Sequence, residues 1–239
     1  IGLNWSAHTT YAQEQPENDN RVNQTRRYLE NGMMAKTETF YDQYNNPIEI
    51  KEYDYNQILK RRTVTSYLSL HNGYNYQTDD SIRLLSLPET TTIFNGAGTQ
   101  VAQSTNEYDV YTDDGNHRPL TAYGSVSQHD SNYGVSKLTR GNVTRIGQWL
   151  NTSGTFIYTY PRFDVLGNVI STKNANGKVT TVSFADDFGL GQNPGTPTQN
   201  PATPTYASPT LITSPPPLPV VLPSELAMFS DMVELMTMR

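Results

Sequence analysis

The chain has 239 residues, a formal net charge of −6 at pH 7 and no cysteine. The absence of cysteine excludes disulfides, thiol catalysis and Cys-ligated metals, and the mild acidity argues against nucleic acid as a partner. Apolar residues make up only 35% of the chain, whereas Thr is abundant and there are 16 Tyr. This composition suits thin, half-buried β-sheets better than a large aliphatic core. No run of about 18 apolar residues occurs, so we expect no membrane span.

Composition divides the chain into four segments. Residues 1–25 are polar and weakly patterned, and residues 26–190 are rich in strand and turn signals. Residues 191–223 combine many Pro with Thr, Asn and Ser, which predicts a semi-extended linker; a docking motif for a proline-reading domain is the alternative. Residues 224–239 predict one short amphipathic helix. Because the chain begins at Ile1 without a signal sequence, we expect a fragment of a longer protein, with any export signal outside it.

Antiparallel strands are expected first over residues 26–68. The pair Asn31-Gly32 predicts a hairpin turn between two of them. Ile48 and Ile50 share one face of the expected strand, whereas Tyr53 and Tyr55 have the other parity, so we expect a β-bulge or a twist between them. Residues 84–108 predict a further hairpin whose turn is Asn95-Gly96-Ala97-Gly98.

Three polar features were candidates for chemistry, and each has a simpler structural interpretation. Residues 69–83 contain His and Asp, but their spacing matches no calcium loop, so we expect a turn-rich insertion. His117 and His129 lie in polar loops without a nucleophile motif, so we expect structural or solvated histidines and no enzyme activity. Lys60-Arg61-Arg62 is too short for a nucleic-acid patch and fits a solvated strand end.

The clearest pattern lies between residues 163 and 189. Phe163-Asp164 is followed by the turn pair Gly167-Asn168, and Asn176-Gly177 is the dipeptide that a type I′ hairpin turn favours. Looser copies lie upstream, including Gly141-Asn142 as a turn without an aromatic-Asp pair of its own. The structural turn residues that carry the pattern are Tyr41, Asp42, Tyr53, Asp54, Tyr108, Asp109, Phe163, Asp164, Gly167, Asn168, Asn176 and Gly177.

These motifs resemble the YD repeat of the RHS family, the bacterial RHS repeat-associated proteins related to toxin-complex shell proteins and teneurins. The resemblance covers about residues 26 to 190, in irregular units, and the Pro-rich stretch after it departs from the family pattern. It implies an all-β fold of stacked antiparallel β-hairpins that form a curved, spiralling sheet, part of a shell. Hairpins too thin to stand alone would stack on their neighbours, because each cannot bury its own apolar face.

The resemblance also implies a role. It is that of a non-catalytic wall segment that encloses or displays a toxin or effector, at the cell surface or secreted. The implied partners are neighbouring RHS repeats and an encapsulated C-terminal toxin. No residues match the family's self-cleaving aspartate motif, so no catalytic residue is assigned, and no cofactor or metal is expected. The alternative is a surface carbohydrate-binding or adhesion β-module, since aromatic residues exposed on one sheet face could stack on glycans.

Overall fold

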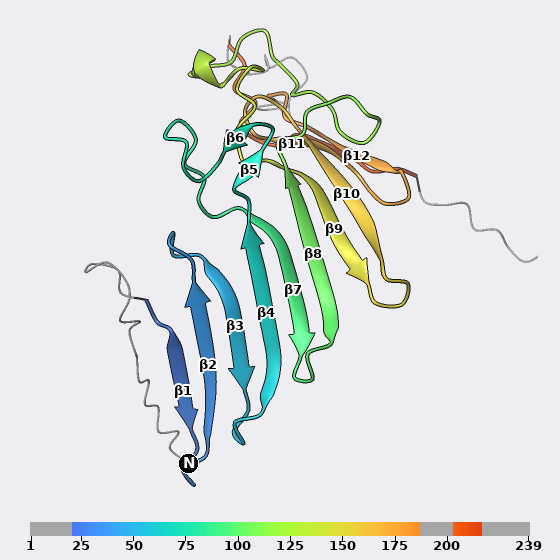
Figure 1. The fold of residues 1–239 in the computed structure, drawn as a ribbon. Helices are drawn as coiled ribbons and strands as arrows, with labels where there is room; N and C mark the ends of the chain where they lie inside the picture. Colours follow the sequence, from blue (N-terminus) through green and yellow to red (C-terminus); the bar gives the residue numbers. More distant parts are fainter. Residues whose placement is uncertain (1–20, 187–202, 217–239) are drawn as a thin grey trace, which may run out of the picture.

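The computed structural model describes residues 21–186 and 203–216, and this part of the chain is all-β (Figure 1). Eleven antiparallel strands form one sheet in the order β1-β2-β3-β4-β7-β8-β9-β10-β11-β12-β13, and β5 and β6 form a separate two-stranded ribbon. The described residues contain one short 3₁₀ helix, Ser131–Tyr133. The predicted all-β class and antiparallel hairpins are therefore confirmed.

The strands follow the chain order, so neighbours in the sequence are neighbours in the sheet. Their bounds are β1 Gln24–Tyr28, β2 Met34–Tyr41, β3 Pro47–Tyr53, β4 Leu59–Tyr67, β5 Leu70–His71, β6 Tyr74–Asn75, β7 Pro88–Asn95, β8 Gln100–Tyr108, β9 Val143–Leu150, β10 Thr155–Phe163, β11 Val169–Lys173, β12 Val179–Ser183 and β13 Leu211–Thr213. The predicted hairpin turn at Asn31-Gly32 joins β1 to β2. The pairing of β3 with β4 shifts register between Glu52 and Tyr53, but the extra residue is Lys60 of β4. Because β3 pairs evenly with β2 from Glu49 to Tyr53, Ile50 and Tyr53 lie on opposite faces of the sheet, and no bulge in this part of β3 brings them to one face.

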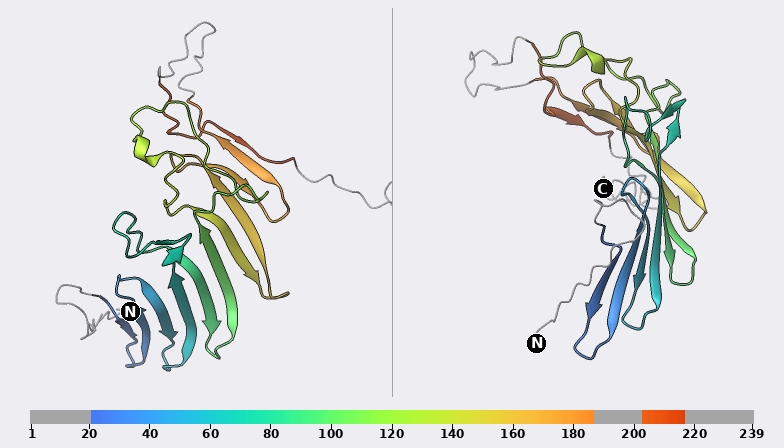
Figure 2. Two further views of the ribbon diagram at one scale, coloured as in Figure 1. Left: turned by 45° about the horizontal axis from the view of Figure 1, so that its top comes forward. Right: turned by 60° about the vertical axis from the view of Figure 1, so that its left-hand side comes forward.

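The two ends of the sheet differ. At one end, which we call the hairpin end, short turns join the strands. At the other end, the insertion end, two of the connections that the structure describes throughout are long: residues 68–87 between β4 and β7, and residues 110–141 between β8 and β9. Figures 1 and 2 show these segments together at the end of the sheet that is uppermost in Figure 1. Figure 1 also shows that strand direction rotates steadily from β1 to β12, the twist expected of a β-sheet.

The buried apolar side chains lie at the insertion end. One cluster is Leu68, Tyr76 and Tyr108, with Leu84 and Leu87 packed against it. A second cluster comprises Leu120, Phe163 and Val165, with Tyr111, Tyr123 and Leu166 packed against it. The insertions therefore provide the apolar contacts that a single sheet cannot provide for itself.

The two faces of the sheet carry different side chains, because residues directly opposite each other on paired strands point to the same face. One face carries aromatic rings with cations beside them: Lys51 by Phe40, Lys36 by Tyr53, Arg62 by Phe94 and Arg145 by Tyr158. We call this the aromatic face. The opposite face carries small and β-branched residues, for example the cross-strand row Thr39, Ile50, Thr63, Ile93 and Ala102.

Part of the predicted linker belongs to the sheet. Leu211–Thr213 forms β13, which pairs with β12, although the crowding of Pro had predicted a semi-extended spacer over residues 191–223. Pro can lie next to an edge strand because the edge needs ladder hydrogen bonds on one side only. The predicted helix at residues 224–239 and most of the weakly patterned segment at 1–25 lie outside the described residues; β1 begins within the latter, at Gln24.

Candidate functional site

The best-defined polar feature of the structure is a turn that recurs at the insertion end. In the turn between β2 and β3, Asp42 Oδ1 accepts hydrogen bonds from the backbone N–H groups of Tyr44 (2.8 Å) and Asn46 (2.9 Å). Asn46 Nδ2 donates to the other carboxylate oxygen at 2.9 Å. Asp164, between β10 and β11, makes the same contacts with the residue two positions on and with both nitrogens of Asn168. The two predicted units therefore share one geometry.

Related turns at the hairpin end use the same acceptor position. The side chains of Asp54, Asn95 and Asn174 each accept from the backbone N–H groups two and four residues further on, at 2.9–3.0 Å. The residue three positions after each acceptor has a positive φ, which favours Gly or Asn. These residues are Asn45 (69°), Gln57 (61°), Gly98 (84°), Gly167 (88°) and Gly177 (74°).

The predicted type I′ turn at Asn176-Gly177 is wrong, because only Gly177 has a positive φ. Gly177 N–H donates to the Asn174 carbonyl at 2.9 Å, and Asn174 N–H donates to the Lys178 carbonyl at 2.9 Å. This is a type I turn followed by a left-handed Gly, a longer hairpin loop than the two-residue form. The Asn174 side chain selects it by satisfying two backbone donors inside the loop.

Asp109 forms a related turn with residues that are more than 30 positions away, although its own φ is +55° and the Asn142 amide donates to Tyr111 Oη rather than to the carboxylate. Its Oδ1 accepts from Asn142 N–H at 2.9 Å, and its N–H donates to the Asn142 carbonyl at 2.9 Å. Gly141, immediately before Asn142, has a φ of +75°, as the equivalent Gly167 does in the uninterrupted turn. Tyr108-Asp109 and Gly141-Asn142, two separate signals in the sequence, are thus the two halves of one turn, and residues 110–141 are inserted between them.

The buried Asp109 carboxylate also joins the two insertions. It is 3% exposed, and its Oδ2 accepts from Tyr76 Oη (2.8 Å), Arg140 N–H (2.8 Å) and Gly141 N–H (2.7 Å). Its Oδ1 accepts from Tyr111 Oη at 2.8 Å. Burial, followed by the hydrogen bond to Asp109 and its charge, raises the pKa of Tyr76 far above its ordinary value. The hydroxyls therefore stay protonated as donors to the carboxylate.

Asp164 has a comparable second role. It is fully buried and accepts from Tyr123 Oη at 3.0 Å, and burial raises the pKa of Tyr123. The ring of Tyr123 stacks on that of Tyr206 at 3.8 Å between centroids, and Asn168 Nδ2 donates to the Tyr206 carbonyl at 3.0 Å. A turn carboxylate thus connects the 110–141 insertion to a residue from the predicted linker.

The aromatic residues that precede the predicted turns hydrogen-bond to backbone carbonyls or pack against neighbouring side chains. Tyr41 Oη donates to the Val22 carbonyl at 2.9 Å, and Tyr108 Oη donates to the Pro88 carbonyl at 2.8 Å. Tyr53 lies under Lys36 on the aromatic face, whereas Phe163 is in a buried cluster. The geometry of these residues is that of turn formation and packing.

His117 has carboxylates at both ring nitrogens. Nδ1 lies 2.7 Å from Asp114 Oδ2, and Nε2 lies 3.3 Å from Glu107 Oε2. The imidazole packs edge-on against Tyr160 at 5.3 Å, so residues 113–117 lie against the aromatic face. Neither ring nitrogen faces a hydroxyl that it could activate, and the contacts are those of a packed side chain that holds the 113–117 loop in place.

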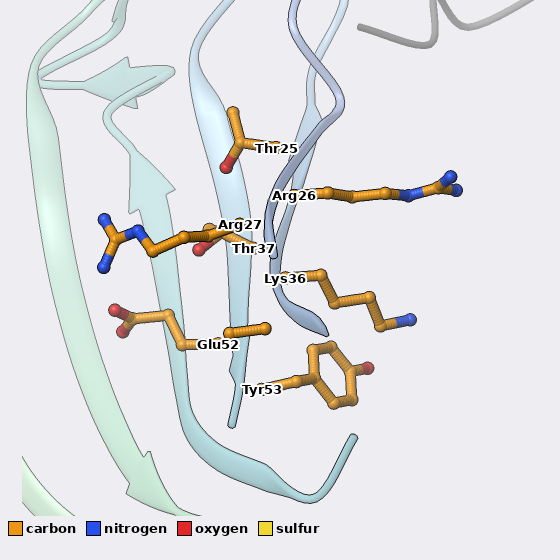
Figure 3. A pocket seen from close by; sticks show the side chains of 8 residues that line it. Thr25, Arg26, Arg27, Lys36, Thr37, Glu52 and Tyr53 are labelled. Atoms are coloured by element: carbon orange, nitrogen blue, oxygen red, sulfur yellow. The ribbon is translucent and has the colours of Figure 1, made fainter. Parts of the chain in front are cut away.

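A shallow depression over β1, β2 and β3 is lined by eight residues, including Arg26, Lys36 and Tyr53 (Figure 3). Figure 3 shows that Arg26, Lys36 and Tyr53 project from one side of the strands, whereas Arg27 and Glu52 project from the other. The cross-strand register places them on opposite faces as well. The depression therefore does not bring these side chains into one binding site.

Within the described ranges, no group of three His, Asp or Glu side chains could hold a metal ion. In the same residues, no helix has the length and apolar character needed to cross a membrane. Comparison with protein-family models and with curated proteins found no match to this chain.

Proposed function

We propose that this chain is a wall segment of the RHS/YD-repeat type, a non-catalytic β-structure that encloses or displays a C-terminal toxin or effector at the cell surface or in secreted form. Its partners in this role are neighbouring repeats and the enclosed polypeptide. The sheet would continue into a curved, spiralling shell as further hairpins add to it.

The recurring carboxylate turn is the observation that carries this proposal. Asp42, Asp109 and Asp164 form it at the same end of the sheet, in the connections β2–β3, β8–β9 and β10–β11 but not in β4–β7, and Asp109 does so across a 110–141 insertion. A turn that keeps the Asp-to-Asn backbone pairing and the positive-φ Gly despite so long an insertion is typical of a repeated unit. Neighbouring hairpins pair in chain order, which is how a repeat array extends a sheet.

Protection of the enclosed polypeptide, in a gene product that carries one downstream, tests the proposal. In the full-length gene product, limited trypsin digestion should leave the downstream polypeptide intact under native conditions and cleave it rapidly once urea opens the sheet. A product in which the sheet resists trypsin while the downstream polypeptide is cleaved at its urea rate would contradict enclosure. Electron micrographs of solid rather than hollow particles would contradict it independently.

A further inference from the structure

We propose that the aromatic face of β9 and β10 is a binding site for an acidic oligosaccharide, a chain that contains uronic acid units. Four aromatic residues lie there: Trp149, Phe156, Tyr158 and Tyr160. This inference stands apart from the shell proposal, because it rests on one face of two strands and not on the repeat.

The four rings form a row along one face. Trp149 of β9 pairs directly with Phe156 of β10, and the alternation of the strand places Tyr158 and Tyr160 on the same face as Phe156. The ring centroids of Phe156 and Tyr158 are 5.9 Å apart, and those of Tyr158 and Tyr160 are 6.3 Å apart. The rings therefore form a continuous aromatic strip along β10.

Gly147 explains why these rings lie against the strand. It pairs with Tyr158, and a Cβ at Gly147 would lie 2.9 Å from Tyr158 Cε1 and 3.2 Å from Phe156 Cδ1. The two rings therefore occupy the space of the missing side chain and lie nearly parallel, at an interplanar angle of 14°. All four aromatic residues are half-buried and none belongs to a buried cluster, so part of each ring remains in contact with solvent.

The row ends at the insertion end against polar residues. His117 packs edge-on against Tyr160, and Lys173, directly opposite Tyr160, donates to Asn116 Oδ1 at 2.7 Å. Arg162 Nε donates to the Asn116 carbonyl at 3.1 Å. An aromatic floor that ends at amide and ammonium groups is suited to a ligand with both apolar ring faces and hydroxyls, as a sugar has.

Charge favours an acidic sugar over a neutral one. On the aromatic face of β8 to β11, the three cations Arg145, Arg162 and Lys173 outnumber two carboxylates: Glu107 of β8 and Asp114, which reaches this face through His117. Arg145 lies 3.2 Å from Glu107 Oε2 and 5.0 Å from the centroid of Tyr158. The whole chain has a net charge of −6 and repels anions on average. The local excess of positive charge at this site would nevertheless favour an anionic ligand there.

A fluorescence titration tests the site. The chain has two tryptophans, so Trp5→Phe leaves Trp149 as the reporter. We expect hexagalacturonate to change the Trp149 emission saturably, with a Kd of roughly 0.1–1 mM, and a neutral β-1,4-glucan hexamer to bind about tenfold more weakly. In the same background, Tyr158→Leu keeps an apolar cover over Gly147 but removes the aromatic face, and should weaken hexagalacturonate binding about tenfold. Ile157→Ala, on the opposite face, is the matched control and should leave the Kd unchanged.

The salt dependence of the Kd separates the contribution of ring stacking from that of charge. Raising NaCl should weaken binding of hexagalacturonate, and Tyr158→Leu should weaken it further at every salt concentration. No saturable change with either hexamer, with circular dichroism showing the native sheet, would overturn the proposal and leave the rings as a cover for Gly147 alone. Equal affinity for the neutral hexamer, or equal weakening by Ile157→Ala and Tyr158→Leu, would also overturn it. So would saturable binding of a proline-rich peptide with none of the sugars.

Discussion

Replacement of Asp109 by Asn should destabilise the insertion end far more than its near-isosteric size suggests. The carboxylate is 3% exposed and accepts five hydrogen bonds, three on Oδ2 and two on Oδ1. An amide offers one oxygen, so the better orientation keeps that oxygen at the Oδ2 position and turns its NH₂ toward Tyr111 and Asn142. The Tyr111 hydroxyl can rotate and accept, whereas the Asn142 N–H cannot.

The size of the effect follows from these contacts. One buried backbone N–H without an acceptor costs about 1–3 kcal/mol, and the four retained hydrogen bonds lose the contribution of a charged acceptor. Together we expect Asp109→Asn to lower the free energy of unfolding by roughly 2–5 kcal/mol. This is a large share of the ~5–15 kcal/mol typical of a folded domain.

Urea unfolding followed by far-UV circular dichroism measures the loss, and Asp54→Asn is the matched control. Asp54 accepts two backbone N–H groups in a turn of the same shape, and Asn95 and Asn174 already perform that task as amides. The control should therefore keep nearly the wild-type midpoint. If Asp109→Asn and Asp54→Asn shift the urea midpoint equally, the network of Tyr76, Tyr111 and Arg140 does not stabilise the fold as argued.

Two further predictions concern a turn and an acid-sensitive contact. Gly167 has a φ of +88° with open space around its Cβ position, so Gly167→Val should lower stability by roughly 1–3 kcal/mol through backbone strain alone. Gly167→Asn should cost less, since Asn45 occupies the same position at 69°; equal losses in thermal melting for Val and Asn would rule out strain as the cause. The hydrogen bond from the His117 side chain, followed by those from the backbone N–H groups of His117 and Asn116, lowers the pKa of Asp114 below its ordinary value of 3.8. Its stabilising contribution is therefore present above about pH 4 and is lost as the pH falls through the lower pKa of the folded state. Asp114→Ala should lower Tm at pH 7, and the Tm difference from the wild type should shrink progressively as the pH falls below about 4; a Tm difference that is independent of pH would contradict this assignment.

Local sequence determined the strands and most of the turns. Asn31-Gly32, Asn95 to Gly98 and the unit from Phe163 to Asn168 all form turns where they were predicted, because acceptor, donor and the residue with positive φ lie within a few positions. The change of face between Ile50 and Tyr53 did not predict a bulge in that part of β3, because both residues keep their own faces and the extra residue near them is Lys60 of β4. The type of turn at Gly177 could not be predicted from Asn176-Gly177 alone. This dipeptide favours a two-residue loop, whereas the Asn174 side chain accepts hydrogen bonds from Asn176 and Lys178 and so stabilises a longer one.

Contacts between distant residues were decided only by the tertiary structure. Nothing in the sequence near Tyr108-Asp109 indicates that its turn closes on Asn142, because the N–H groups that satisfy the carboxylate come from beyond the insertion. The same holds for Leu211–Thr213, whose place in the sheet depends on the exposed edge of β12 and not on its own Pro-rich surroundings. Short-range hydrogen bonding can be inferred from residue order, whereas a buried carboxylate or a strand edge acquires its partners only when the chain brings them together.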